Sequence, residues 1–294
     1  MGRHMALLIS KHEWLGQETS RRGYNYDLAV ITRELEKRQK TILELQLQEW
    51  NSIVSERRWS YKTQRRKISS VRALLKLRGI TRHFIFDIEW PSGARKDPRR
   101  LKPAQRDVCL AATYKQREIL GTRNRAIIWT FWDLGIRKFE LCGAVLADLD
   151  LNPEDPTLQL LTKAASARNG QYKPRAYETK MFVNDDAVAA MDAWLDVRDR
   201  IADPRSKTIF VSQIGGRALS PEGVSDVFKA LSKVVGFPVS THDFRRGAGT
   251  DAVERGVPDR LIMKQLGILT HKVFQGYTAR ASLRAYRRLM RGDA

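Results

Sequence analysis

The sequence predicts a mainly helical protein of two domains, with a small antiparallel β-sheet in the C-terminal domain. Three observations support this prediction. The 294 residues are more than one ordinary core requires, apolar residues recur at helical spacing along most of the chain, and only two short segments are typical of strands. A segment rich in proline, glycine and basic residues, 91–103, indicates an exposed basic linker. We therefore expect a helical domain at 1–90 and a second domain at 104–294.

The first domain is predicted to contain a long helix over 27–53 and a second helix that includes residues 68–77. Apolar side chains recur at Ile68, Val71 and Leu74, which indicates a buried stripe. The surrounding segment, 51–82, holds ten basic residues and a single acidic one, so the opposite face of this helix can lie along DNA phosphates. The predicted contacts are Arg57, Arg58, Lys62, Arg65, Arg66, Lys67, Arg72 and Lys76.

The second domain is predicted to be mainly helical around two strands. The strands are expected at 157–161 and 177–183, with the turn-forming pair Asn169-Gly170 between them. Ser220 followed by Pro221 is typical of a helix start, as a cap and a first helical residue. The helices themselves are expected over 106–120, 123–134, 139–146, 186–201 and 221–235, and the arginine-rich tail 278–294 is predicted to form a short amphipathic helix.

Charge and composition indicate the class of partner. The chain carries 53 Lys and Arg against 33 Asp and Glu, a net charge of +20, which favours nucleic acid over an anionic membrane surface. Its two cysteines exclude a disulfide scaffold and a cysteine-based zinc site, and they fit a reducing compartment. The longest apolar run is too short to cross a bilayer, and no signal peptide is recognisable. We expect a protein that is not secreted, located in the cytoplasm or nucleoid of a prokaryote or the nucleus of a eukaryote.

Common catalytic motifs are missing from the sequence, but a set of basic and hydroxyl side chains follows in a suggestive order. No phosphate-binding loop, zinc-binding helix or nucleophilic serine elbow is present, and the five histidines lack ligand spacing. We therefore expect neither a metal nor a cofactor. Each candidate alone has an ordinary structural explanation, such as a surface ion pair or a half-buried ring. The ordered candidates are Arg137 with Glu140, Lys163, His242 with Arg245, Gln265-Leu266-Gly267, and Tyr277.

Taken together, these residues resemble the tyrosine recombinases, also called phage integrases. That family has a Gly-x-Arg-x-x-Glu-Leu segment, a strand-borne lysine, a His-x-x-Arg pair, a Leu-Gly-(His or Trp) step and a tyrosine in this order. The resemblance covers roughly residues 101–278. It implies double-stranded DNA as the partner and a homo-oligomer on DNA, a tetrameric synapse. The implied reaction is DNA cleavage and rejoining through a 3′-phosphotyrosyl bond, without metal or other cofactor.

The resemblance also implies a role for each candidate. Tyr277 would be the nucleophile, Arg137 and Arg245 would bind the phosphate, and Lys163 would protonate the leaving 5′ oxygen. His242 would assist proton transfer or hold the phosphate, and Glu140 would orient it or an arginine. The sequence departs from the family at Ile268, which stands where the family has His or Trp and cannot donate a hydrogen bond.

Several alternatives stay open at this stage. Lys173 is a rival for the role of the lysine, and His271 is an alternative donor three residues beyond Ile268. A recombinase-like DNA-binding protein with weak or lost cleavage would also fit the isoleucine. A type IB topoisomerase is a third possibility, because it resembles the same set of residues.

Overall fold

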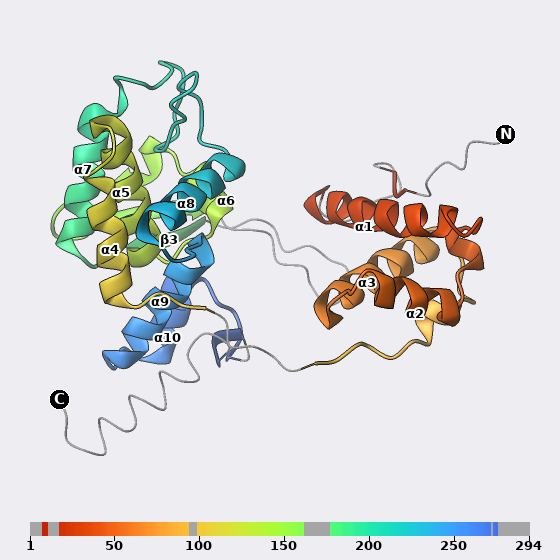
Figure 1. Cartoon of the computed structure of the whole chain (residues 1–294). Coiled ribbons are helices and arrows are strands. Elements are labelled where there is room, and N and C mark those ends of the chain that lie inside the picture. The colour runs from red at the N-terminus through yellow and green to blue at the C-terminus, as the bar shows by residue number, and fades with distance from the viewer. Residues whose placement is uncertain (1–7, 11–17, 94–98, 162–176, 272, 276–294) are drawn as a thin grey trace. The chain divides into compact units, whose positions relative to one another are not determined.

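The computed structural model describes residues 8–10, 18–93, 99–161, 177–271 and 273–275. The chain divides into two compact units, residues 1–96 and 97–294, each of which has its own colour range in Figure 1. The described residues are mainly helical with one three-stranded antiparallel sheet in the second unit. The predicted fold class is therefore confirmed. None of the described helices is long and apolar enough to cross a membrane.

The first unit consists of α1 (Glu18–Glu36), α2 (Leu47–Glu56) and α3 (Tyr61–Leu77), followed by a short 3-10 turn, η2 (Phe84–Phe86). α1 packs against α3 around a core of buried aliphatic side chains. The residues of the predicted stripe, Ile68, Val71 and Leu74, are all buried there.

The single helix predicted over 27–53 is wrong, because the chain breaks into two helices. α1 ends at Glu36, and Gln39 adopts a positive φ of 54° that no continuous α-helix allows. The short 3-10 turn η1 (Ile42–Glu44) follows, and the Thr41 backbone N–H donates to Glu44 Oε2 at 2.8 Å. The sequence between the helices is a polar run, 36–41, which offers no apolar contact to hold a helix against the core.

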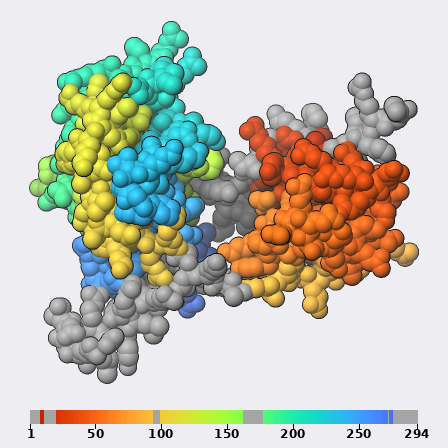
Figure 2. All heavy atoms as spheres, viewed as in Figure 1, coloured from red at the N-terminus to blue at the C-terminus, as the bar shows by residue number. Residues whose placement is uncertain are grey.

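The second unit is built around α5 (Glu118–Asp133), which is buried along most of its length. α5 packs against α4 (Pro103–Thr113), α7 (Asp185–Arg198) and α9 (Thr241–Glu254). α4 also packs against α8 (Pro221–Val235), and these two helices form adjoining parts of the surface in Figure 2. α6 (Lys138–Gly143) contacts α8 and the sheet, while α10 (Asp259–Leu266) packs on α9.

The sheet has the strand order β1-β2-β3 and is antiparallel throughout. β2 (Thr157–Leu161) lies where it was predicted, and β3 (Tyr177–Met181) ends two residues earlier than expected. Leu158 on β2 is opposite Lys180 on β3, which places Lys180 on the buried face of the strand. The two-residue strand β1 (Leu149–Asp150) was not predicted, because a period of two cannot be recognised in two residues. Asn169-Gly170, the predicted turn, lies outside the described residues.

Most helix predictions in this unit hold, with corrections at the ends. α8 has the predicted bounds, and Ser220 Oγ accepts a hydrogen bond from the Gly223 N–H at 3.0 Å. The helix expected to run to residue 120 stops at Thr113, and the helix expected to begin at 123 begins at Glu118. The end of the predicted linker belongs to the second unit, since Leu101 is buried and its N–H donates to Asp243 O at 3.1 Å. Arg99 also pairs with Asp243, at 2.7 Å.

Candidate active site

Arg137 is the N-cap of α6 and its guanidinium bridges two elements. Nη1 donates to Glu140 Oε1 at 2.7 Å, and the Arg137 backbone N–H donates to Glu140 Oε2 at 2.6 Å. Nη2 donates to the Gly267 carbonyl at 2.9 Å, 130 positions along the chain. The Arg137 side chain is 38% exposed while that of Glu140 is 5% exposed. Glu140 therefore orients Arg137 from the protein side and leaves part of the guanidinium open to solvent.

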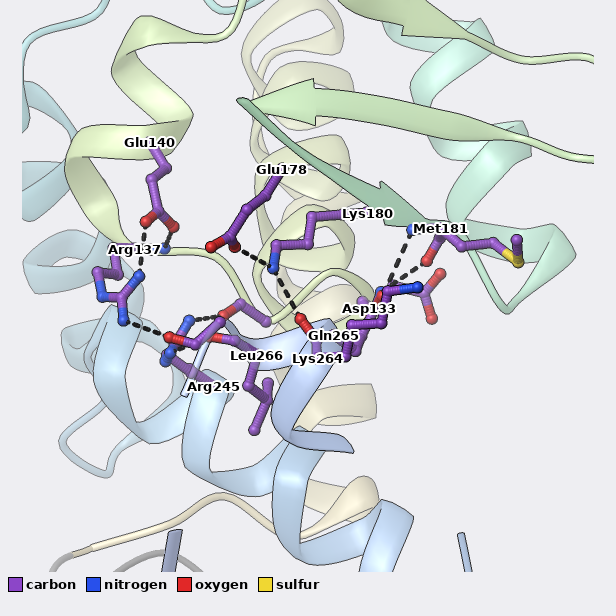
Figure 3. Close-up of polar contacts among 12 residues, drawn as sticks. Asp133, Arg137, Glu140, Glu178, Lys180, Met181, Arg245, Lys264, Gln265 and Leu266 are labelled. Carbon is purple, nitrogen blue, oxygen red and sulfur yellow. Dashed lines mark hydrogen bonds and ion pairs between the residues drawn. The ribbon is translucent and has the colours of Figure 1, made fainter. Parts of the chain in front are cut away.

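Arg245 approaches the same turn from α9 and is almost fully buried, with 2% exposure. Its two terminal nitrogens donate to the carbonyls of Gly135 and Leu266. Figure 3 shows Arg245 and Arg137 converging on the end of α10 from different helices. The two guanidinium groups, which α6 and α9 position, thus donate to adjacent carbonyls, those of Leu266 and Gly267.

Two glycines permit this close arrangement. Gly267 follows α10 with a φ of +58°, and Gly135 precedes Arg137 with a φ of +56°. A Cβ at Gly135 would lie 2.1 Å from Leu266 Cδ2, far inside contact distance. The two Leu-Gly pairs, Leu134-Gly135 before Arg137 and Leu266-Gly267 after Gln265, are therefore packed against each other.

His242 lies in the first turn of α9, exposed, and three residues before Arg245. Loss of hydration, together with the positive charges of Arg246, Arg245 and Arg137, lowers the pKa of His242. A lowered pKa keeps the ring neutral at pH 7, which is the state that can accept a proton.

Lys180 and Glu178 are parts of this site that the sequence analysis missed. The Lys180 side chain is 3% exposed, and Nζ donates to Glu178 Oε2 at 2.8 Å and to the Lys264 carbonyl at 3.0 Å. Residues two apart on a strand share a face, so a Glu-x-Lys sequence within the predicted strand was a usable signal. Gln265 adds a second link between α10 and β3, because its Nε2 donates to the Met181 carbonyl at 2.7 Å.

Three of the predicted site residues, Lys163, Lys173 and Tyr277, lie outside the described residues. Ile268 is 6% exposed and packs in a small apolar cluster with Val253, Ile262, Leu266 and Phe274. His271 is exposed, and its ring meets the edge of the Phe274 ring at a centroid distance of 6.5 Å. Within the described ranges, no group of three or more His, Cys, Asp or Glu side chains is placed to hold a metal ion.

The predicted DNA-contacting residues of the first unit fall into two groups. In one group the cation pairs with an acid or a carbonyl of the unit, although the side chains of Arg57 and Arg66 are still 42% and 57% exposed. Lys67 is buried against Asp27 at 3.1 Å, Arg66 pairs with the same carboxylate, Arg57 pairs with Glu34, and Arg72 donates to the carbonyls of Ile85, Phe86 and Ile88. The other group, Arg58, Lys62, Arg65 and Lys76, has exposed side chains.

A groove of about 970 Å³ on the second unit adjoins residues 266–267, to which Arg137 and Arg245 donate. β3, α9 and α10 line it, with Val183, Leu261 and Leu269 among its exposed apolar side chains. Asp133 and Asp251 are also in its wall, and burial raises the pKa of both carboxyl groups.

Comparison with known proteins identifies the family. Residues 99–284 match the model of the phage integrase family. The chain is 28% identical over 265 residues to tyrosine recombinase XerC of Corynebacterium glutamicum, covering 87% of this chain and 80% of the relative. It is 29% identical over 189 residues to XerC of Pseudomonas fluorescens, covering 64% and 58%. The chain belongs to the phage integrase family, and it is an enzyme of the tyrosine recombinase type that cleaves and rejoins DNA.

Solved structures share the fold over most of the chain. The Tn1549 transposon integrase in complex with transposon right end DNA matches with a TM-score of 0.73 at 18% identity, covering 96% of this chain and 95% of that one. XerH recombinase bound to its difH substrate in a post-cleavage complex matches with a TM-score of 0.70 at 15% identity, covering 92% and 79%. A lambda integrase tetramer bound to a Holliday junction matches with a TM-score of 0.64 at 16% identity, covering 90% and 72%.

Proposed function

We propose that this recombinase cleaves DNA with Tyr277 as the nucleophile and with Arg137 and Arg245 as the phosphate-binding residues. The phenolic oxygen forms a bond to the scissile phosphorus, and the bond from phosphorus to the 5′ oxygen breaks. The departing 5′ oxygen takes a proton from Lys163, and the DNA keeps a 3′-phosphotyrosyl link. Rejoining reverses these steps with a 5′ hydroxyl as the attacking group, so the reaction needs no external energy source.

The observation that carries this proposal is the convergence of Arg137 and Arg245 on residues 266–267. Guanidinium groups donate in a planar pair that suits the non-bridging oxygens of a phosphate. Two of them stabilise the extra negative charge that develops as the phosphorus becomes pentacoordinate. Tyr277 follows Gly267 by ten residues, a short enough connection to bring its side chain to the same place.

Neutral His242 suits the role of proton acceptor for Tyr277. A tyrosine phenol has a reference pKa of about 10, so it needs a base or nearby cations to react at neutral pH. The cations of Arg137 and Arg245 lower the cost of forming the phenolate. We assign His242 as the acceptor of the Tyr277 proton, because the lowered pKa leaves its ring neutral and able to accept one.

A nicked suicide substrate tests the nucleophile. Loss of a short fragment after cleavage prevents rejoining, so the covalent adduct accumulates and its peptide can be mapped. We expect the adduct on Tyr277 and none with Tyr277→Phe. Adducts that persist in the phenylalanine variant would contradict the assignment. Relaxation of supercoiled plasmid by single copies, without a specific site, would instead favour a type IB topoisomerase.

We further propose that several copies assemble on DNA and that the tail of one copy binds the groove of its neighbour. Strand exchange between two duplexes requires more than one active site, and a tetramer on a junction is the state named for the lambda integrase structure. Leu269, which lines the groove, is six residues before the last described residue. The tail sequence beyond it carries apolar side chains at helical spacing, Leu283, Tyr286, Leu289 and Met290.

Sedimentation on DNA carrying two binding sites tests the assembly. We expect a chain that stops after Thr278, and the groove variant Leu261→Asp, to occupy single sites while losing the complexes that hold several copies. Ile214→Asp is the matched control, because Ile214 is 89% exposed and lies outside the groove. Normal assembly by the shortened chain would contradict the proposal, because it would show that assembly does not need the tail.

A further inference from the structure

Lys180 is a buried cation that links β3 to the end of α10. Its ammonium makes two hydrogen bonds, one to the Glu178 carboxylate and one to the Lys264 carbonyl. The last carbonyls of a helix lack the usual partner four residues further on and carry the negative end of its dipole. The Lys264 carbonyl accepts the Gly267 N–H at 3.1 Å as well as the Lys180 ammonium. A cation at this position therefore stabilises the end of α10 and holds it on the strand (Figure 3).

The same pair lies against the turn that the two arginines contact. A Cβ built on Gly267 would be 2.8 Å from Glu178 Oε2, 3.3 Å from Lys180 Nζ and 3.7 Å from Arg137 Nη1. Three charged groups from two separate elements thus surround one α-carbon. The Gly267 carbonyl is the acceptor for Arg137, and the preceding carbonyl, of Leu266, is the acceptor for Arg245.

We propose that Lys180, together with Glu178, is a positioning residue that fixes the end of α10 and thereby the phosphate-binding geometry of Arg137 and Arg245. The proposal rests on the assignment of those two arginines as phosphate ligands. Lys180 acts through backbone carbonyls: it sets where residues 264–267 lie, and these residues set the direction of both guanidinium groups.

The surroundings of Lys180 suit a positioning role. Its ammonium is held between the Glu178 carboxylate on its own strand and the Lys264 carbonyl at the end of α10. Burial lowers its pKa, while Glu178 opposes that shift and favours the charged form. A catalytic acid must reach the leaving oxygen, whereas a positioning cation needs only its two acceptors.

Loss of this link is expected to affect the chemical step more than DNA affinity. The grip on DNA comes from many sequence-independent phosphate contacts spread over a large surface. Cleavage instead depends on the alignment of two guanidinium groups with one phosphate, and a displacement of about 1 Å costs about 100-fold in rate.

Single-turnover cleavage by Lys180→Met tests the proposal, using two versions of the nicked suicide substrate. One version has an ordinary scissile phosphate, and the other has sulfur in place of the 5′ bridging oxygen. A thiol has a pKa of about 8.5, so the departing thiolate needs no proton donor. We expect about 100-fold slower cleavage of both versions, with DNA affinity within threefold of the unaltered chain. Lys180→Arg, which keeps the charge, is expected to recover part of the rate.

Matched variants separate this effect from a general loss of charge or of folding. Lys229→Met removes a lysine on α8 that is exposed and pairs with Asp226 at 2.9 Å, and it is expected to cleave normally. Glu178→Gln keeps the shape of its side chain but loses the charge that holds Lys180, and about fivefold slower cleavage is expected. It serves as the test if Lys180→Met does not fold, as judged by circular dichroism and thermal unfolding.

Three results would overturn the proposal. Normal cleavage by folded Lys180→Met would show that the link from Lys180 to α10 is not needed. Normal cleavage by Glu178→Gln would show that the ion pair between Glu178 and Lys180 is not needed. Recovery of Lys180→Met on the sulfur substrate alone would make Lys180 the proton donor instead. Failure of the proposed function is seen separately, because the unaltered chain would then form no adduct at Tyr277.

Discussion

At the scale of single residues, the site is a set of cations whose partners lie far away in the sequence. Arg137 contacts Gly267, Arg245 contacts Gly135, and Lys180 contacts Lys264. In each case the acceptor is a backbone carbonyl, so the cation and the chain fix each other. The arginines and their spacing were predictable from the sequence. The sequence places Lys180 on one face of the predicted strand with Glu178, but its contact with Lys264, 84 positions away, is visible only in the tertiary structure.

Ile268 illustrates how burial changes the interpretation of a motif. The family has a hydrogen-bond donor at this position, and the isoleucine here belongs to an apolar cluster. We predict that Ile268→His gives no gain in cleavage rate and lowers the free energy of unfolding by about 2 kcal/mol, because a polar ring enters a site without partners for it. Single-turnover cleavage and urea unfolding measure the two effects.

A faster Ile268→His enzyme of unchanged stability would contradict this prediction. It would mean that the side chain at 268 turns toward the phosphate when DNA is bound and that the isoleucine limits the rate. Ile268→Val is the control, since it keeps the apolar contact while removing a single methylene, and about 1 kcal/mol is the expected loss.

At the scale of elements, α3 has two kinds of basic residue that the sequence could not distinguish. Lys62 and Lys76 are exposed, while Arg72 donates to three carbonyls of the segment that follows α3. Both kinds occur in one basic segment. Helical spacing predicts on which face of the helix a residue lies, but it does not predict which groups its side chain contacts. The direction of a long side chain depends on which acceptors the neighbouring segments bring near it.

We predict opposite consequences for the two kinds of residue. Lys62→Gln combined with Lys76→Gln is expected to lower the slope of log affinity against log salt by about 2 and to leave stability unchanged. Arg72→Met is expected to leave that slope unchanged and to lower the free energy of unfolding by about 2 kcal/mol, because three partly buried carbonyls lose their donor. DNA binding over a range of salt and urea unfolding test this. Equal slopes for the double variant and the unaltered chain would contradict it.

His83 gives the first unit a pH dependence. Its Nδ1 accepts the Ile85 N–H at 3.2 Å, and burial lowers its pKa below the usual 6.5. The unfolded chain then binds more protons between the lowered pKa and 6.5, so the stabilisation is complete above 6.5 and is lost as the pH falls through the folded value. We predict that hydrogen exchange of α3 becomes faster from pH 6.5 downward, after correction for the intrinsic exchange rate.

The matched variant His83→Gln isolates this contribution, because glutamine does not titrate. The pH dependence of α3 protection should become shallower in the glutamine variant over the same range. An identical dependence in both proteins would assign the effect to other groups of the first unit.

At the scale of the whole molecule, each unit has its own main buried apolar cluster, and the second unit also has the small cluster around Ile268. The prediction of two domains stays a proposal, with residues 1–90 and 104–294 as its bounds. We predict that Ile68→Ala, in the core of the first unit, costs about 3 kcal/mol there and leaves the protection of α5 unchanged. Hydrogen exchange measured peptide by peptide separates the two units.

The reciprocal variant Ile127→Ala removes a fully buried side chain from α5 in the second unit. It should lower protection in α5 and α7 without affecting α1 and α3. Loss of protection in both units from either change would show that they unfold as one.

The sequence by itself determined the helical class, the two strands β2 and β3, and the order of Arg137, His242, Arg245 and Tyr277, because these depend on local periodicity and spacing. Only the tertiary structure decided which of the 53 basic residues are used inside the protein. Lys67 pairs with Asp27 across 40 positions, and Arg137 meets Gly267 across 130. The physical reason is that the role of a charged side chain depends on which groups lie near it in the folded chain. Those partners come from segments that the linear pattern does not place side by side.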